Sequence, residues 1–244
     1  VSEPTVNRFC RSMDTRGFPD FKLHLAQSLA NGTPYVNRNV DEDDSVESYT
    51  GKIFESAMAS LDHVRQSLDN AAVNRAVDLL TQAKKIAFFG LGSSAAVAHD
   101  AMNKFFRFNV PVIYSDDIVL QRMSCMNCSD DDVIVLISHT GRTKSLVELA
   151  QLARENDAMV IALTSPGTPL AREATLAITL DVPEDTDIYM PMVSRLAQLT
   201  VIDVLATGFT LRRGAKFRDN LKRVKEALKE SRFDKELLIK SDDR

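Results

Sequence analysis

The sequence predicts an α/β domain with a doubly wound, five-stranded parallel sheet, and two observations lead to this fold class. From residue 86 onward, short aliphatic runs alternate with amphipathic segments of helix length. The runs are apolar on both faces, as in strands that helices cover on both sides. We therefore expect parallel strands joined by helical crossovers. The predicted strands span residues 86–89, 110–114, 133–138, 159–164 and 176–180.

Helices are predicted before the sheet. Residues 3–29 show two short helical patterns, which a Gly-Thr-Pro sequence at 32–34 ends. The acidic run at 41–44 is either a solvated linker or a helix start. A longer helix follows from Ser45, and a second one follows an interruption at Asn70. Their apolar positions recur at spacings of three and four.

Two helices are predicted after the sheet, an apolar one at 194–211 and a charged one at 216–230. The first is apolar on more than one face, which indicates packing beyond its own domain. We therefore expect a homodimer or a higher oligomer. The residues concerned are Leu196, Leu199, Val201, Ile202, Val204, Leu205 and Phe209.

The composition indicates a globular protein with an uneven charge distribution. The formal net charge is −4, yet up to residue 39 five cationic side chains outweigh three acidic ones. This pattern is typical of a nucleic-acid-binding segment joined to an acidic sensor. Neither a membrane-spanning stretch nor a secretory leader is present, which predicts a soluble, cytoplasmic protein. The chain begins without Met inside a predicted helix, which indicates a fragment.

Three cysteines, Cys10, Cys125 and Cys128, are too few for a disulfide framework and favour a reducing compartment. The spacing of the last two is compatible with a metal or redox pair. It lacks both the second pair of a zinc site and the strand-to-helix context of a redox motif. We expect a structural role, and the sequence predicts no metal and no cofactor.

Three predicted strand ends are rich in Gly, Ser and Thr, and open α/β sheets bind ligands beyond such ends. The first contains Gly92, Ser93 and Ser94. Its glycines permit close backbone approach, and the following helix offers N–H groups to an anion. It lacks the third glycine and the ribose-binding acid of a dinucleotide fingerprint. A turn that serves geometry alone is the alternative.

The second strand end contains Ser138, His139, Thr140 and Thr143, directly before a predicted helix. Its three hydroxyls can converge on phosphate oxygens at the positive end of the helix dipole. A simple helix cap would need only one hydroxyl. The third strand end, 164–171, contains two prolines and a glycine, which make a turn whether or not a ligand binds.

In this order and spacing, the three strand ends resemble those of a sugar isomerase (SIS) domain over residues 79–211. The resemblance implies a phosphosugar-binding fold that holds its ligand at these ends. Residues 1–11 and 17–22 are similar to the recognition helix and the next helix of the RpiR family of transcriptional regulators. With the helix start at Ser194 and Arg195, the whole chain is similar to the HexR type of that family, the regulators of hexose catabolism.

The resemblance divides the chain into a partial helix-turn-helix domain (1–40), a helical connector (41–82), a SIS domain (83–212) and a C-terminal helix and tail (213–244). It also implies DNA contacts at the start of the recognition helix, where side chains meet base edges and phosphates. DNA binding is expected of the full-length protein. The implied DNA-binding residues are Ser2, Thr5, Asn7, Arg8 and Arg11.

Phosphosugar isomerases share this fold and need a general base beside the sugar. The available groups are His99, His139 and Glu184, and each has a non-catalytic alternative. We expect a sensor and not an enzyme. Ser194 and Arg195 suit an acidic sugar, because a guanidinium pairs with a carboxylate while the hydroxyl loops hold the phosphate. The resemblance implies 2-keto-3-deoxy-6-phosphogluconate as the effector.

Three functional classes stay open: a ligand-responsive regulator, a phosphosugar isomerase and a binding module without output. The regulator is favoured. Its ligand would bind two arrangements of a dimer with different affinity and so alter DNA binding through the helical connector.

Overall fold

The computed structural model describes residues 3–12, 15–19, 21–22, 39–188 and 190–229. The chain folds into two compact units. One comprises Val1–His63 with Pro183–Val193, and the other comprises Val64–Val182 with Ser194–Arg244. Most of the second helix predicted within residues 3–29 lies outside the described residues.

The first unit contains α1 (Glu3–Ser12) and most of α3 (Val46–Ser67). Cys10 of α1 is fully buried, and Phe9 packs edge-on against Phe21 at 5.8 Å between ring centroids. This short helix therefore keeps an apolar contact despite its largely polar sequence.

The acidic run at 41–44 contains a turn and lies just before α3, which begins at Val46. Lys52, two turns into the helix, bonds Asp41 at 2.9 Å and Asp44 at 2.7 Å. Hydrogen bonding to Lys52, aided by Ser48, lowers the pKa of Asp44 to about 2. The carboxylates are thus folded back onto the helix.

The second unit is built on the predicted five-stranded sheet, and all four strand pairings are parallel. The strand order is β2-β1-β3-β4-β5. The strands are β1 (Lys85–Gly90), β2 (Val112–Tyr114), β3 (Asp132–Ser138), β4 (Met159–Thr164) and β5 (Leu176–Thr179). The predicted fold class is therefore confirmed, with β2 and β5 shorter than expected.

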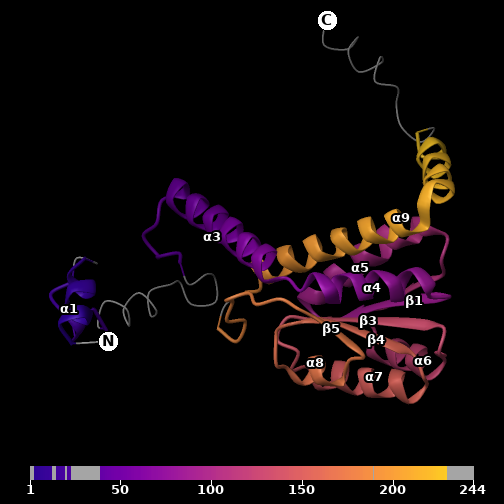
Figure 1. Cartoon of the computed structure of the whole chain (residues 1–244), viewed down its shortest axis with the longest axis horizontal. Helices are drawn as coiled ribbons and strands as arrows, with labels where there is room; N and C mark the ends of the chain where they lie inside the picture. Colours follow the sequence, from indigo (N-terminus) through magenta and orange to yellow (C-terminus); the bar gives the residue numbers. More distant parts are fainter. Residues whose placement is uncertain (1–2, 13–14, 20, 23–38, 189, 230–244) are drawn as a thin grey trace, which may run out of the picture. The chain divides into compact units, whose positions relative to one another are not determined.

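Helices cover both faces of this sheet, as Figure 1 shows. The helices α4, α5 and α9 lie on one side, and α6, α7 and α8 lie on the other. Their bounds are α4 (Asn70–Gln82), α5 (Ser93–Phe105), α6 (Ile118–Met126), α7 (Lys144–Glu155), α8 (Pro169–Glu173) and α9 (Val193–Ala227), with a 3-10 turn at Phe106–Phe108.

Asp69 caps α4 by accepting hydrogen bonds from the N–H groups of Ala71 and Ala72, which explains the interruption predicted near Asn70.

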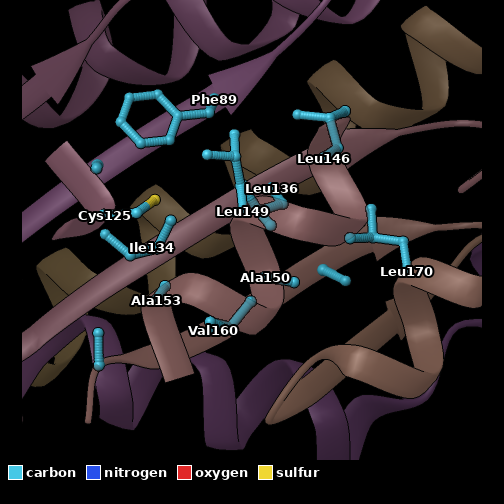
Figure 2. Packing of buried hydrophobic residues seen from close by; sticks show 13 residues of the cluster. Phe89, Cys125, Ile134, Leu136, Leu146, Leu149, Ala150, Ala153, Val160 and Leu170 are labelled. Carbon is cyan, nitrogen blue, oxygen red and sulfur yellow. The ribbon is translucent and has the colours of Figure 1, made fainter. Parts of the chain in front are cut away.

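A hydrophobic core lies on each face of the sheet, because successive strand residues alternate in direction. Phe89 packs with Ile134 and Leu136 against α7, through Leu146 and Leu149 (Figure 2). Both strand and helix side chains are almost fully buried there. This packing holds α7, and therefore its N-terminus, at a fixed place on the sheet.

Phenylalanines fill the opposite face. Phe88 contacts Phe105 of α5, and Phe105 contacts Phe209 of α9, with centroids 5.1 and 5.5 Å apart. Phe108 stacks on Phe209 at 5.0 Å. Phe209, together with Val201, Ile202 and Leu205 of the apolar set considered for a partner, is therefore buried within the chain itself. The two helices predicted at 194–211 and 216–230 follow each other within α9 (Val193–Ala227), with a kink where Gly214 has a φ of 77°.

The cysteine pair belongs to this packing. Cys125 is fully buried in the core, and burial raises the pKa of its thiol to about 12. Cys128 is half-buried, and burial raises the pKa of its thiol as well. Both are free thiols. Among the described residues, no helix is long and apolar enough to cross a membrane.

Candidate functional site

The strand order places β1 beside β3, and we refer to the region beyond the carboxyl ends of these two strands as the β1–β3 crevice. The chain leaves β1 for α5 on one face and leaves the neighbouring β3 for α7 on the other. Adjacent strands whose connections depart to opposite faces form a topological switch point, where open α/β sheets bind ligands. The first and second predicted loops follow these two strands, so the structure brings them to the same crevice.

The loop after β1 turns sharply into α5. A Cβ atom at Gly90 would lie 2.6 Å from the carbonyl oxygen of Ser94, so only glycine permits this approach. Gly92 is the N-cap of α5 and provides no side-chain hydrogen bond to the helix. Ser93 is half-buried and Ser94 is buried. No side chain caps this helix N-terminus, where the N–H groups of Ser94 and Ala95 donate to the carbonyls of Leu91 and Gly92 at 3.2 and 3.1 Å.

The loop after β3 is built on Ser138, which is buried at the end of the strand. Its Oγ accepts a hydrogen bond from the N–H of Gly141 at 3.2 Å, and its hydroxyl proton is a further donor. Thr140 and Thr143 are half-buried. Thr143 is the N-cap of α7 but makes no capping hydrogen bond with its side chain. Its hydroxyl does not serve as the simple helix cap that was the alternative.

The loop after β4 bonds to the loop after β3. The N–H of Ser165 donates to the carbonyl of His139 at 3.0 Å, and the N–H of Leu170 donates to that of Gly141 at 3.1 Å. Thr168 caps α8 by accepting from the N–H of Ala171 at 3.2 Å. The third strand end is therefore a turn with defined partners.

The two candidate histidines, His99 and His139, have aromatic or polar neighbours. Nδ1 of His139 lies 3.4 Å from Oγ of Ser165, so the ring is turned toward the loop after β4. His99 is exposed on α5, and its ring lies against Tyr114 at 4.9 Å between centroids.

Glu184 has a helix-capping position. Its Oε1 accepts hydrogen bonds from the N–H groups of Met192 and Val193, each at 2.7 Å. These are amides at the start of α9, where a carboxylate is favoured by the helix dipole. This arrangement gives the side chain a structural role at the start of α9.

Ser194 and Arg195 lie in the first turn of α9. Ser194 is buried, with 2% of its surface exposed, whereas Arg195 is exposed. The buried Gln198 follows Ser194 by one turn. The exposed guanidinium at position 195 is accessible to an anionic ligand.

Gln121 is a residue near the crevice that sequence reasoning missed. It is fully buried on α6, and its Nε2 donates to the carbonyl of Ser115 at 2.7 Å and to that of Gly90 at 3.4 Å. It thereby ties the end of β1 to the segment after β2. The sequence gives no clear signal for it, because α6 contains other polar residues, Arg122 and Ser124.

The predicted DNA-binding residues lie on α1. Thr5, Arg8 and Arg11 are exposed and recur every third residue, so they share one side of the helix. Ser2 lies outside the described residues, and so does the side chain of Asn7.

Two surface hollows lie away from the β1–β3 crevice. One, of about 390 Å³, is lined by residues of β2 and α6, and the other, of about 290 Å³, by residues of α4 and α9. Neither contains a predicted ligand-binding residue.

Comparisons with protein families match both parts of the chain. Residues 79–208 match the SIS domain, and residues 1–32 match the helix-turn-helix domain of the rpiR family. Both predicted resemblances are thereby confirmed.

Two relatives are named HTH-type transcriptional regulator HexR. The Escherichia coli K12 protein is 94% identical over 244 residues, which cover 100% of this chain and 84% of that protein. The Pseudomonas aeruginosa protein is 57% identical over 233 residues, covering 96% of this chain and 82% of that protein. Because both relatives are regulators, the expectation of a regulator and not an enzyme is confirmed.

Solved structures share the fold. The Vibrio vulnificus NanR protein complexed with ManNAc-6P matches with a TM-score of 0.69 at 24% identity, covering 96% of this chain and 83% of that one. The sugar isomerase domain of an RpiR transcription factor from Sphaerobacter thermophilus matches with a TM-score of 0.62 at 18% identity, covering 72% and 98%. With two domain models matched in order and a regulator 94% identical over the full length of this chain, this chain belongs to the HexR-type transcriptional regulators of the RpiR family.

Proposed function

We propose that this regulator binds a phosphorylated sugar acid at the β1–β3 crevice and that occupancy of the crevice alters its affinity for DNA. The first candidate effector is 2-keto-3-deoxy-6-phosphogluconate. The phosphate would lie between the loops after β1 and β3, within reach of Ser93, Ser94, Ser138, Thr140 and Thr143, with Gly92 and His139 shaping the loops.

The observation that carries this proposal is the convergence of two helix N-termini on one switch point. The N-caps of both α5 and α7 make no side-chain capping bond, and the dipoles of the two helices favour an anion in the crevice. Two buried hydroxyls, those of Ser94 and Ser138, stand at the same edge. Neutral donors combined with helix dipoles are the usual composition of a phosphate site.

The acid part of the ligand is assigned to Ser194 and Arg195. A guanidinium binds a carboxylate with two parallel hydrogen bonds, and Arg195 is exposed for such a pairing. The solved Vibrio vulnificus NanR protein, of the same fold, is complexed with the phosphorylated sugar ManNAc-6P. That protein's ligand supports the phosphosugar class for this chain.

The output would be a change in DNA affinity. The contacts with DNA are assigned to Ser2, Thr5, Asn7, Arg8 and Arg11, whose described members line one side of α1. Arg8 and Arg11 would meet phosphates, and the uncharged residues would meet base edges or the backbone. A ligand shifts such an equilibrium only by its differential affinity for two arrangements, which amounts to about five- to 150-fold in typical cases.

The regulator would act as a homodimer or a higher oligomer in the cytoplasm. Leu196, Val204 and Leu211 of α9 are between 40% and 67% exposed, whereas the phenylalanine cluster accounts for the buried side of this helix. These exposed residues are the surface that we assign to the partner copy.

Calorimetric titration tests the ligand assignment. The wild-type chain should bind 2-keto-3-deoxy-6-phosphogluconate in preference to glucose 6-phosphate, and Ser94→Ala or Ser138→Ala should remove most of that affinity. Ser129→Ala is the matched control, because Ser129 bonds Asp132 at the opposite end of β3. Equal binding by all three variants would refute the assigned site, and no heat with either sugar would refute the effector.

A further inference from the structure

The third Ser/Thr-rich strand end lies beside the proposed phosphate loop. In the sheet, Ser138 at the end of β3 is in register with Thr164 at the end of β4, so the two following loops leave the sheet as neighbours. The loop after β4 was equally compatible with a ligand contact and with a plain turn. Its hydrogen bonds indicate a different role, directed at the loop after β3.

Two carbonyls of the β3 loop are turned toward the β4 loop. That of His139 accepts from the N–H of Ser165 at 3.0 Å and from Oγ1 of Thr164 at 3.5 Å. That of Gly141 accepts from the N–H of Leu170 at 3.1 Å. The β4 loop therefore fixes the orientation of two peptide groups in the β3 loop.

The orientation of a carbonyl determines that of the next amide. In a trans peptide, C=O and N–H point to opposite sides, and the described chain has no cis peptide bond. The N–H groups of Thr140 and Arg142 are therefore directed away from the β4 loop, and that of Arg142 donates to Oγ1 of Thr140 at 3.4 Å. Because β3 lies between β4 and β1, this direction leads toward the β1 side and the crevice.

Thr164 and Thr168 form the support for this arrangement. Their Oγ1 atoms lie 3.3 Å apart, and Oγ1 of Thr168 also donates to the carbonyl of Ser165 at 3.1 Å. A Cβ at Gly141, whose φ is +56°, would overlap with both hydroxyl oxygens. Thr164 is only 1% exposed, and its hydroxyl contacts the carbonyl of His139 and the hydroxyl of Thr168.

We infer that Thr164 and Thr168 are positioning residues for phosphate: their hydroxyl pair fits against Gly141 and aims the amides of Thr140 and Arg142 into the β1–β3 crevice. The ligand touches the β3 loop, while the β4 loop determines its shape. This inference rests on the proposed phosphate site and adds the residues that maintain its geometry.

Calorimetry with threonine variants tests this role. With 2-keto-3-deoxy-6-phosphogluconate as the probe, and inorganic phosphate as a second probe, Thr164→Val and Thr168→Val should each weaken binding about ten- to 100-fold, as for the loss of a charge-assisted hydrogen bond. Thr164→Ser and Thr168→Ser keep the hydroxyl and should restore the affinity. Thr175→Val is the matched control, because Oγ1 of Thr175 accepts from the N–H of Val160 at the other end of β4. It should lower the melting temperature without changing affinity.

Amide NMR of the wild-type chain provides a test that needs no variant. Inorganic phosphate should shift the resonances of Thr140 and Arg142 and leave those of Ser165 and Leu170 in place. Unshifted amides at 140 and 142, or folded valine variants with wild-type affinity, would overturn the inference while the phosphate site stands. A wild-type chain that binds neither probe would remove the proposed site and the inference with it.

Discussion

Gly141 lies directly against Thr168, with no room for a Cβ atom between its backbone and the threonine hydroxyl. The backbone of Gly141 also has a φ of +56°, a region that residues with a Cβ rarely adopt. Sterics and conformation thus both demand glycine at this place in the β3 loop.

We expect Gly141→Ala to lower the free energy of unfolding by about 2–5 kcal/mol, the sum of a strained backbone and an overpacked contact. Gly167→Ala is the control, because Gly167 also has a positive φ but open space around its Cβ position. The control should cost about 1–2 kcal/mol. Urea denaturation measures both, and equal losses would show that the contact with Thr168 is unimportant.

Gln121→Met should destabilise the sheet near the crevice. The substitution preserves the length of the side chain but removes the donor to the carbonyls of Ser115 and Gly90. The expected loss is about 1–3 kcal/mol, the cost of leaving buried polar groups unsatisfied. The exposed Gln151→Met on α7 should stay within about 0.5 kcal/mol of wild type. A Gln121 variant as stable as this control would contradict the assigned role.

The start of α3 should depend on pH through Asp44. Its pKa in the folded chain is about 2, below the ordinary value of 3.8, because Lys52 bonds its carboxylate. A depressed pKa means that the pair stabilises the fold above about pH 4 and that this stabilisation is lost as the pH falls toward 2.

Carbon-detected NMR titration measures that pKa directly. In Lys52→Met, the pKa of Asp44 should rise toward 3.8. Lys84→Met, which breaks the ion pair with Asp131, is the control and should leave Asp44 unchanged. A pKa near 3.8 in the wild type would show that the ion pair does not form in solution.

Cys125 and Cys128 should react slowly with thiol reagents. Thiolates react and thiols do not, and burial raises the pKa of Cys125 to about 12 and that of Cys128 above its usual value. At pH 8 we expect Ellman's reagent to label Cys125 only as the chain unfolds, and Cys128 more slowly than a free thiol. Urea-unfolded protein provides the reference rate. Rapid labelling of folded Cys125 would contradict its burial.

Much of the fold could be predicted because buried parallel strands have a local signature. The run at 133–138 is apolar at nearly every position, and β3 occupies Asp132–Ser138. The order of the strands has no such signature, since it depends on which crossovers pass over β1. The short α8 was also missed, because two prolines and a glycine read as a turn.

The candidate site was predictable only in part. Glycines and hydroxyls at strand ends identified the loops of Ser94 and Ser138, but their common crevice follows from the adjacency of β1 and β3. The support that Thr164 gives to the β3 loop depends on its register with Ser138. The hydrogen bond from Gln121 to the carbonyl of Ser115 depends on how α6 packs against the sheet. Both are tertiary relationships that residue spacing does not encode.

The most direct test of the central claim is DNA affinity with and without the sugar. Fluorescence anisotropy should be measured on full-length Escherichia coli HexR, the 94% identical relative, with duplexes that it selects from genomic fragments and at one fixed salt concentration. We predict that saturating 2-keto-3-deoxy-6-phosphogluconate changes the Kd by about five- to 150-fold, and that Ser138→Ala abolishes the change without altering the affinity of the sugar-free protein. An unchanged Kd for the wild type would contradict the account.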